Sequence, residues 1–101
     1  MIEFKYEKEK QIALYIANSL ADQKALSILE CGTVKNSDEA LHLAQFYWRA
    51  VDELIKLSDS KIEICNESNL QEWSEHLFNT FRSYLKRSGY SAEWAQASES
   101  A

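Results

Sequence analysis

Apolar residues recur every three or four positions between residues 37 and 57, which is the spacing of a helix face. Stepped by about 100° per residue, they cover roughly 220° of the helix circumference, whereas a surface helix typically has an apolar stripe of about 100°. One side of this surface consists of Leu43, Phe46, Tyr47, Ala50, Leu54 and Leu57. A second side beside it consists of Leu41, Ala44, Trp48, Val51 and Ile55. We therefore predict a central helix over residues 37–57 that is covered on at least two sides.

Polar residues predict where this helix begins and what its polar stripe does. Asn36 is a favourable N-cap residue, and Glu39 stands at the third helical position, as in a capping box. Arg49 and Glu53 are opposite charges four residues apart, a spacing that stabilises a helix by about 0.2–0.5 kcal/mol. We therefore predict a helix start just after Asn36 and an ion pair between Arg49 and Glu53.

A first helix is predicted over residues 7–31, because Gly32 is a favourable residue just beyond a helix C-terminus. Its apolar pattern is interrupted at Asp22, Gln23 and Lys24. Two interpretations follow: one helix that changes neighbours halfway, or two helices bent near Asp22. We favour one continuous helix, because neither glycine nor proline marks a break.

A third helix is predicted over residues 69–88, ending at Gly89. Its apolar residues share an arc of roughly 140°. They are Leu70, Trp73, Leu77, Phe78, Phe81, Tyr84 and Leu85. A short C-terminal helix follows with Trp94 as its anchor, and the tail at about residues 97–101 is expected to be frayed.

Two short stretches, residues 2–6 and residues 61–65, alternate apolar and polar residues as strands do. One interpretation pairs them as a two-stranded ribbon. The other treats residues 61–65 as an extended linker whose Ile62 and Ile64 pack into the core. We favour the linker, because an isolated pair of strands is only marginally stable in water.

These patterns predict an all-α fold. It is a compact bundle of three main helices, at about residues 7–31, 37–57 and 69–88, plus the short C-terminal helix. All 101 residues are expected to form a single domain. The chain has no proline and only two glycines, which favours long helices over a sandwich with its many turns. Phe46 and Phe81 are predicted to lie in the core.

Charge and cysteine content narrow the classes of function. The formal net charge is −5 at pH 7, so no nucleic-acid partner is expected, because such binding usually needs a basic face. Cys31 and Cys65 form no C-x-x-C pair and are expected to be reduced, partly buried thiols of a cytoplasmic protein; the alternative is one disulfide in an exported protein. The charged residues 1–10 do not resemble a signal peptide. No membrane association is expected, because no apolar run approaches the ~20 residues of a membrane span.

The candidates for chemistry are acidic residues and histidines at helical spacing. Glu39 and His42 form an E-x-x-H pair, a spacing that di-iron bundles use, but such sites need a second pair and two further glutamates. Glu72 and His76 are four residues apart, so they are a second candidate pair of metal ligands. A composite zinc site would combine both histidines with the two cysteines, but no local spacing supports it. We therefore expect no cofactor, metal or catalytic residue.

The favoured function is a small, acidic, non-catalytic protein-interaction module, such as an inhibitor, immunity-type protein or adaptor that binds a basic protein surface. The apolar surface of the central helix is wider than two companion helices would cover, so part of its second apolar side is expected to bind a partner. The expected partner-binding residues are Leu41, Trp48, Ile55, Asp59, Glu63 and Glu67. One alternative is a homodimeric regulatory helical protein. A second alternative is a metal-binding protein or enzyme using Glu39, His42 and His76.

Overall fold

The computed structural model describes residues 1–58 and 69–100 of the chain. These residues contain five helices and no strand. The helices are α1 Glu7–Ser19, α2 Gln23–Cys31, α3 Ser37–Ser58, α4 Leu70–Arg87 and α5 Ser91–Ser100. The predicted all-α fold is thus confirmed for the described part of the chain, with five helices where four were expected. Residues 2–6 are not a strand, and residues 61–65, for which a linker or a ribbon was predicted, lie outside the described residues.

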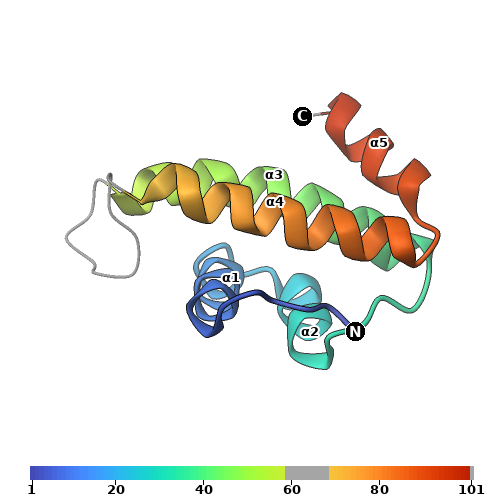
Figure 1. Cartoon of the computed structure of the whole chain (residues 1–101), viewed down its shortest axis with the longest axis horizontal. Helices are drawn as coiled ribbons and strands as arrows, with labels where there is room; N and C mark the ends of the chain where they lie inside the picture. Colours follow the sequence, from blue (N-terminus) through green and yellow to red (C-terminus); the bar gives the residue numbers. More distant parts are fainter. Residues whose placement is uncertain (59–68, 101) are drawn as a thin grey trace.

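The two long helices, α3 and α4, form the centre of the molecule and lie side by side in antiparallel orientation (Figure 1). α1 and α2 pack against one side of this pair, and α5 crosses the opposite side near the N-terminal end of α3. None of the described helices is both long enough and apolar enough to cross a membrane. The arrangement places α3 between α2 below it and α5 above it.

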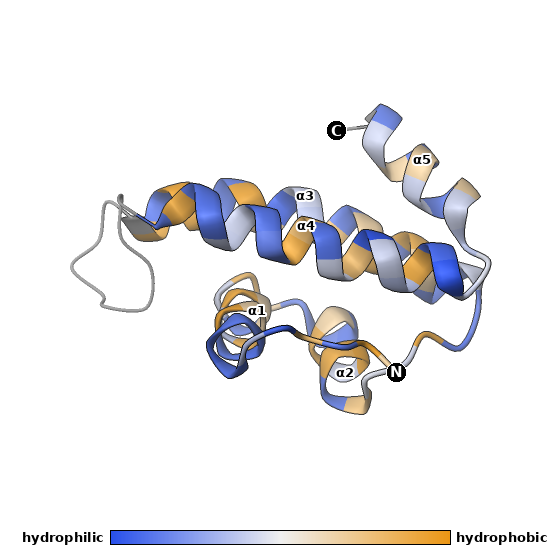
Figure 2. Cartoon of the chain, in the orientation of Figure 1, coloured by the Kyte–Doolittle hydropathy of each residue, from blue (hydrophilic) through white to orange (hydrophobic). Residues whose placement is uncertain are grey.

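The first apolar side of α3 forms the core, as predicted. All six of its residues are buried, namely Leu43, Phe46, Tyr47, Ala50, Leu54 and Leu57. Phe46 of α3 and Phe81 of α4 are fully buried, with ring centroids 6.3 Å apart. Burial of one such side chain contributes about 1.5–3 kcal/mol, so these rings hold the two long helices together. Hydrophobic and hydrophilic residues alternate along both helices (Figure 2), as expected for amphipathic helices.

The helix predicted as one continuous element is two helices, α1 and α2, so the favoured interpretation is wrong and the alternative near Asp22 is correct. α1 ends in a Schellman motif, in which the Asp22 N–H donates to the Ala17 carbonyl (2.9 Å) and the Ala21 N–H donates to the Asn18 carbonyl (3.0 Å). Ala21 closes this motif in the left-handed conformation, with φ 55°. Asp22 then caps α2 by accepting a hydrogen bond from the Ala25 N–H (3.0 Å). The helix is therefore broken at a residue that is neither glycine nor proline.

The start of α3 agrees with the prediction. Asn36 Oδ1 accepts a hydrogen bond from the Glu39 N–H (2.9 Å), and Glu39 Oε1 accepts one from the Lys35 N–H (3.0 Å). Together these bonds form a capping box shifted by one residue, because the glutamate reaches the amide before the N-cap residue. The Glu39 carboxylate is therefore already engaged at the end of its own helix.

The predicted ion pair between Arg49 and Glu53 is wrong, because both side chains bind other helices. The Arg49 guanidinium donates to Asp22 at the start of α2 (2.7 Å), and Glu53 accepts a hydrogen bond from the Ser19 hydroxyl at the end of α1 (2.9 Å). The polar stripe of α3 is therefore not only a solvated face. It is the surface on which the junction between α1 and α2 is seated.

α5 extends further than predicted. The helix continues to Ser100, where fraying was expected at about residues 97–101. Trp94 and Ala97 lie about one turn apart and are both buried, at 7% and 2% exposed, so packing holds this helix in place. The Trp94 ring packs against Tyr47 of α3 with centroids 5.6 Å apart. It also packs against the Trp48 ring, with centroids 6.3 Å apart. α5 therefore covers part of the second apolar side of α3.

The N-terminal segment ties α1 and α2 to the rest of the fold. The Ile2 N–H donates to the Gly32 carbonyl at the end of α2 (2.6 Å). Glu9 of α1 is fully buried, and its carboxylate accepts hydrogen bonds from the Lys5 N–H (3.1 Å) and from the Thr80 hydroxyl of α4 (2.5 Å). A buried carboxylate is tolerated only when it is hydrogen-bonded, and both of these bonds come from neutral donors.

Candidate functional site

An open groove of about 660 Å³ runs between α3 and α5. The lining residues are Gln45, Trp48, Arg49, Val51 and Asp52 of α3 and Ala97 and Ser98 of α5. We call this surface the α3–α5 groove. It lies on the second apolar side of α3, beside the part that α5 covers, which makes it the best-formed candidate for a binding site on the described part of the chain.

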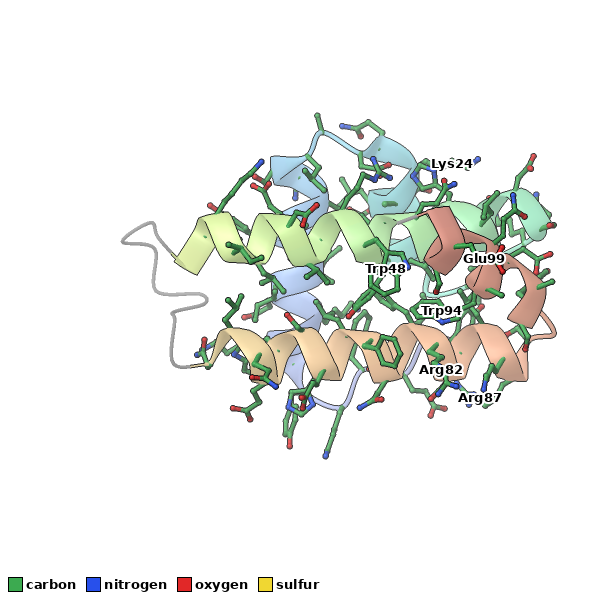
Figure 3. All side chains as sticks on the ribbon, turned by 90° about the horizontal axis from the view of Figure 1, so that it is seen from above. Lys24, Trp48, Arg82, Arg87, Trp94 and Glu99 are labelled. Atoms are coloured by element: carbon green, nitrogen blue, oxygen red, sulfur yellow. The ribbon has the colours of Figure 1, made fainter. Side chains whose placement is uncertain are left out.

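The floor of the α3–α5 groove is apolar. Trp48 and Val51 are half-buried, and Ala97 is buried. The Trp48 ring packs against the Trp94 ring of α5, with centroids 6.3 Å apart. Figure 3 shows the two indoles between α3 and α4. This floor can therefore accept apolar side chains from another molecule.

Arg49, one of the lining residues, belongs to an ion cluster at the start of α2. The Asp22 carboxylate accepts a hydrogen bond from Arg49 Nη2 at 2.7 Å, and His42 Nε2 lies 2.7 and 2.9 Å from its two oxygens. The Asp22 side chain is 5% exposed, whereas that of Arg49 is 48% exposed. The cluster therefore ties Arg49, a residue of the groove lining, to the start of α2.

Asp22 remains a carboxylate in spite of its burial. Burial raises the pKa of this carboxyl, but the hydrogen bonds from the Ala25 N–H and His42, together with the charges of His42 and Arg49, outweigh it and hold the pKa below its usual value of 3.8. The positive charge of Arg49 is therefore compensated by a fixed negative charge at neutral pH.

The other charged residue of the lining is Asp52. It is exposed, and no ion pair joins it to another of the described residues. Since Asp22 compensates Arg49, the formal charge presented by the α3–α5 groove is negative. A partner with a positive charge near an apolar side chain would match both features of this surface.

The predicted partner-binding residues have separate positions in the structure. Trp48 is part of the floor of the groove. Leu41 is half-buried and packs against the core, and Ile55 is 50% exposed one turn beyond Val51. The three acidic residues of this prediction, Asp59, Glu63 and Glu67, lie outside the described residues.

The candidate metal ligands are not brought together. Glu39 is engaged in its capping box, and His42 contacts Asp22. His76 Nε2 lies 3.6 Å from Glu72 Oε1 on α4, and the His76 ring packs against Tyr6 with centroids 5.1 Å apart. No group of three histidine, cysteine or acidic side chains suited to a metal ion occurs among the residues of the two described ranges.

The two cysteines were expected to be partly buried thiols. Cys31, the last residue of α2, is a free thiol, as expected, but it is exposed, so the expected partial burial is wrong for it. The position after it is Gly32, where the chain leaves the helix, and this places Cys31 at the surface rather than on the packed face. Cys65 lies outside the described residues.

Of the seven residues that line the groove, only Trp48 was predicted from the sequence to bind a partner. Asp22 was noted only as an interruption of an apolar pattern, although an acidic residue between two apolar helical stretches is an N-cap signal. Ala97 and Ser98 were assigned to a frayed tail. Their apolar spacing from Trp94 is one helical turn, which could have indicated a longer helix.

Comparison with known proteins yields no relative: no family model, no curated protein and no solved structure matches this chain.

Proposed function

We propose that this chain is a small, acidic, non-catalytic protein-interaction module that binds a basic surface of another protein in its α3–α5 groove. The observation that carries the proposal is the composition of the groove. Its floor is apolar at Trp48, Val51 and Ala97, and its uncompensated charge is that of Asp52. Interfaces between proteins combine an apolar centre with a charged rim in this way.

The charge of the whole chain supports a basic partner. The formal net charge is −5, and residues 59–68 contribute Asp59, Glu63 and Glu67 against one lysine. This acidic segment follows α3 directly in the sequence. Long-range attraction between an acidic module and a basic partner raises the rate of association and selects against acidic partners.

The test is a capture experiment with matched baits. The wild-type chain, Val51→Glu and Ala92→Glu are immobilised and exposed to a lysate of the source organism. Both substitutions add one negative charge, but Val51 lies on the floor of the groove, whereas Ala92 is an exposed residue in the first turn of α5. We expect one basic protein to be retained by wild type and Ala92→Glu and lost by Val51→Glu. The purified partner must then bind wild type and Ala92→Glu more tightly than it binds Val51→Glu.

Two results would contradict the proposal. If Val51→Glu and Ala92→Glu retain the same proteins as wild type, the groove is not the binding surface. If light scattering over a range of concentrations shows a dimer that Val51→Glu abolishes, the groove binds a second copy, and the regulatory homodimer takes the place of the module.

A further inference from the structure

Arg49 occupies an unusual place for a groove that is proposed to bind a basic partner. Its side chain lines the α3–α5 groove, where a free guanidinium would repel a lysine or arginine of the partner. Instead, its Nη2 atom is 2.7 Å from the Asp22 carboxylate. An opposite charge at this distance cancels most of the field that Arg49 would otherwise exert on the groove.

Asp22 is held where it can do this by contacts that are independent of Arg49. Its Oδ1 atom accepts the capping hydrogen bond from the Ala25 N–H at 3.0 Å, and both of its oxygens lie within 2.9 Å of His42 Nε2. The carboxylate is thus fixed by the start of α2 and by α3 together. It cannot follow Arg49 if the guanidinium moves toward solvent.

We infer that Asp22 is a positioning residue that sets the charge preference of the α3–α5 groove by holding and neutralising Arg49, so that the groove takes an amphipathic segment carrying lysine or arginine. In this arrangement the apolar side chains of the partner lie on Trp48 and Val51, and a cationic side chain faces Asp52. The inference rests on the proposed function. Charge complementarity also selects this occupant over a second copy, since two chains of net charge −5 repel each other.

Two substitutions on either side of the same ion pair separate this role from a structural one. Asp22→Asn keeps a side-chain oxygen for the helix cap, since asparagine and aspartate are comparable N-cap residues, but it leaves the charge of Arg49 uncompensated. Arg49→Gln removes the positive charge and leaves Asp22 in place. If the pair only stabilised the fold, both variants would weaken binding. If it sets the charge of the groove, the two variants have opposite effects.

The probes are two synthetic peptides with the same helical pattern of leucines and with lysine in one and glutamate in the other at the polar positions. Affinity is measured by titration calorimetry, and the site is located from the Val51 and Ala97 methyl resonances. For the lysine peptide, we expect Asp22→Asn to bind about threefold more weakly than wild type and Arg49→Gln about threefold more tightly at low salt. The double variant should return to within about twofold of wild type, and the differences should vanish in about 1 M salt, where the Debye length is about 3 Å.

Glu30→Gln is the matched control, because it also removes one negative charge but lies on the exposed side of α2, outside the lining of the groove. The inference is overturned if Asp22→Asn and Glu30→Gln have equal effects, or if both members of the ion pair weaken binding when replaced. The proposed function remains standing in either case. It fails separately if the lysine peptide leaves the Val51 and Ala97 resonances of the wild-type chain unchanged, or if the glutamate peptide binds more tightly.

Discussion

The chain passes from one helix to the next by the same motif at two places, after α1 and after α4. At the first, Ala21 has φ 55°, and the Asp22 N–H donates to the Ala17 carbonyl at 2.9 Å. At the second, Gly89 has φ 86°, and the Tyr90 N–H donates to the Leu85 carbonyl at 2.7 Å. The hydrogen bonds correspond, but only one junction has the residue that favours a left-handed conformation.

The difference shows what stabilises each junction. At Gly89 the local backbone preference is sufficient, because glycine adopts positive φ without strain. At Ala21 the same conformation costs about 1–2 kcal/mol, and tertiary contacts must offset this cost. Those contacts come from Asp22, the next residue, through its cap on α2 and its contacts with His42 and Arg49. One junction is therefore encoded locally and the other through the packed fold.

The largest expected change in the free energy of unfolding comes from substitutions in the core, against which the helices at both junctions pack. Phe46→Ala or Phe81→Ala should lower the free energy of unfolding by about 3–5 kcal/mol, because each removes a fully buried ring and leaves a cavity. Phe78→Ala, at a half-buried position of α4, should cost less. The measurement is urea denaturation of the three variants. Unchanged urea midpoints for both core variants would contradict this core assignment.

Removal of Asp22 should break the first junction and leave the second intact. Asp22→Ala loses a helix cap and leaves a buried cluster without its acceptor, so we expect a loss of about 2–3 kcal/mol. Asp22→Asn should lose less, because it retains the cap. Hydrogen exchange should show faster exchange in α2 and no change in α5. Equal acceleration in both helices would mean that the two junctions are not independent.

Exchanging the residues in the left-handed conformation should have opposite effects at the two junctions. Gly89→Ala should destabilise the protein by about 1 kcal/mol, and the cost is purely conformational, because an added Cβ meets no atom within 4 Å. Ala21→Gly should stabilise it by about 0.5–1 kcal/mol, since relief of strain exceeds the larger backbone entropy of glycine in the unfolded chain. Denaturant midpoints at constant m-value measure both. Destabilisation by Ala21→Gly would show that Ala21 carries no strain.

The smallest expected change is in the pH dependence of stability, and it concerns only the junction between α1 and α2. Because the folded-state pKa of Asp22 lies below its usual value of 3.8, its carboxylate contributes stability that is fully present above that value. The contribution is lost as the pH falls from there through the folded-state pKa. The difference in unfolding free energy between wild type and Asp22→Asn should therefore be constant well above pH 3.8 and shrink as the pH falls below that value. A difference that grows as the pH falls would contradict the direction of the shift.

The sequence predicted the long helices well, because their stability comes from periodic apolar faces. α3 and α4 agree with the predicted ranges 37–57 and 69–88 to within one residue at each end. The break between α1 and α2 could not be predicted by searching for glycine or proline, since Ala21 adopts its conformation under the influence of contacts made elsewhere. Arg49 was predicted to form an ion pair with Glu53, four residues away, but its partner is Asp22, 27 residues away in the sequence.

The candidate site was predicted only in part for the same reason. Trp48 was singled out from the width of the apolar surface on its helix, and it lies in the groove. The groove itself is formed by α5 crossing α3, and no periodicity in either helix indicates where that crossing occurs. Local patterns therefore identified the apolar surface, whereas the position of the groove, and the neutralisation of Arg49 in its lining, depend on tertiary structure.

The buried carboxylate of Glu9 has a consequence for the order in which the chain assembles. Its hydrogen-bond donor Thr80 is 71 residues away, so it is synthesised only after α1, α2 and α3. Until α4 arrives, Glu9 stays hydrated, and α1 cannot reach its final depth in the core without leaving an acceptor unsatisfied. Contacts between such distant residues form late, since the intervening loop must close first. We therefore expect α1, which is synthesised before α4, to reach its final packing only after α4 has docked.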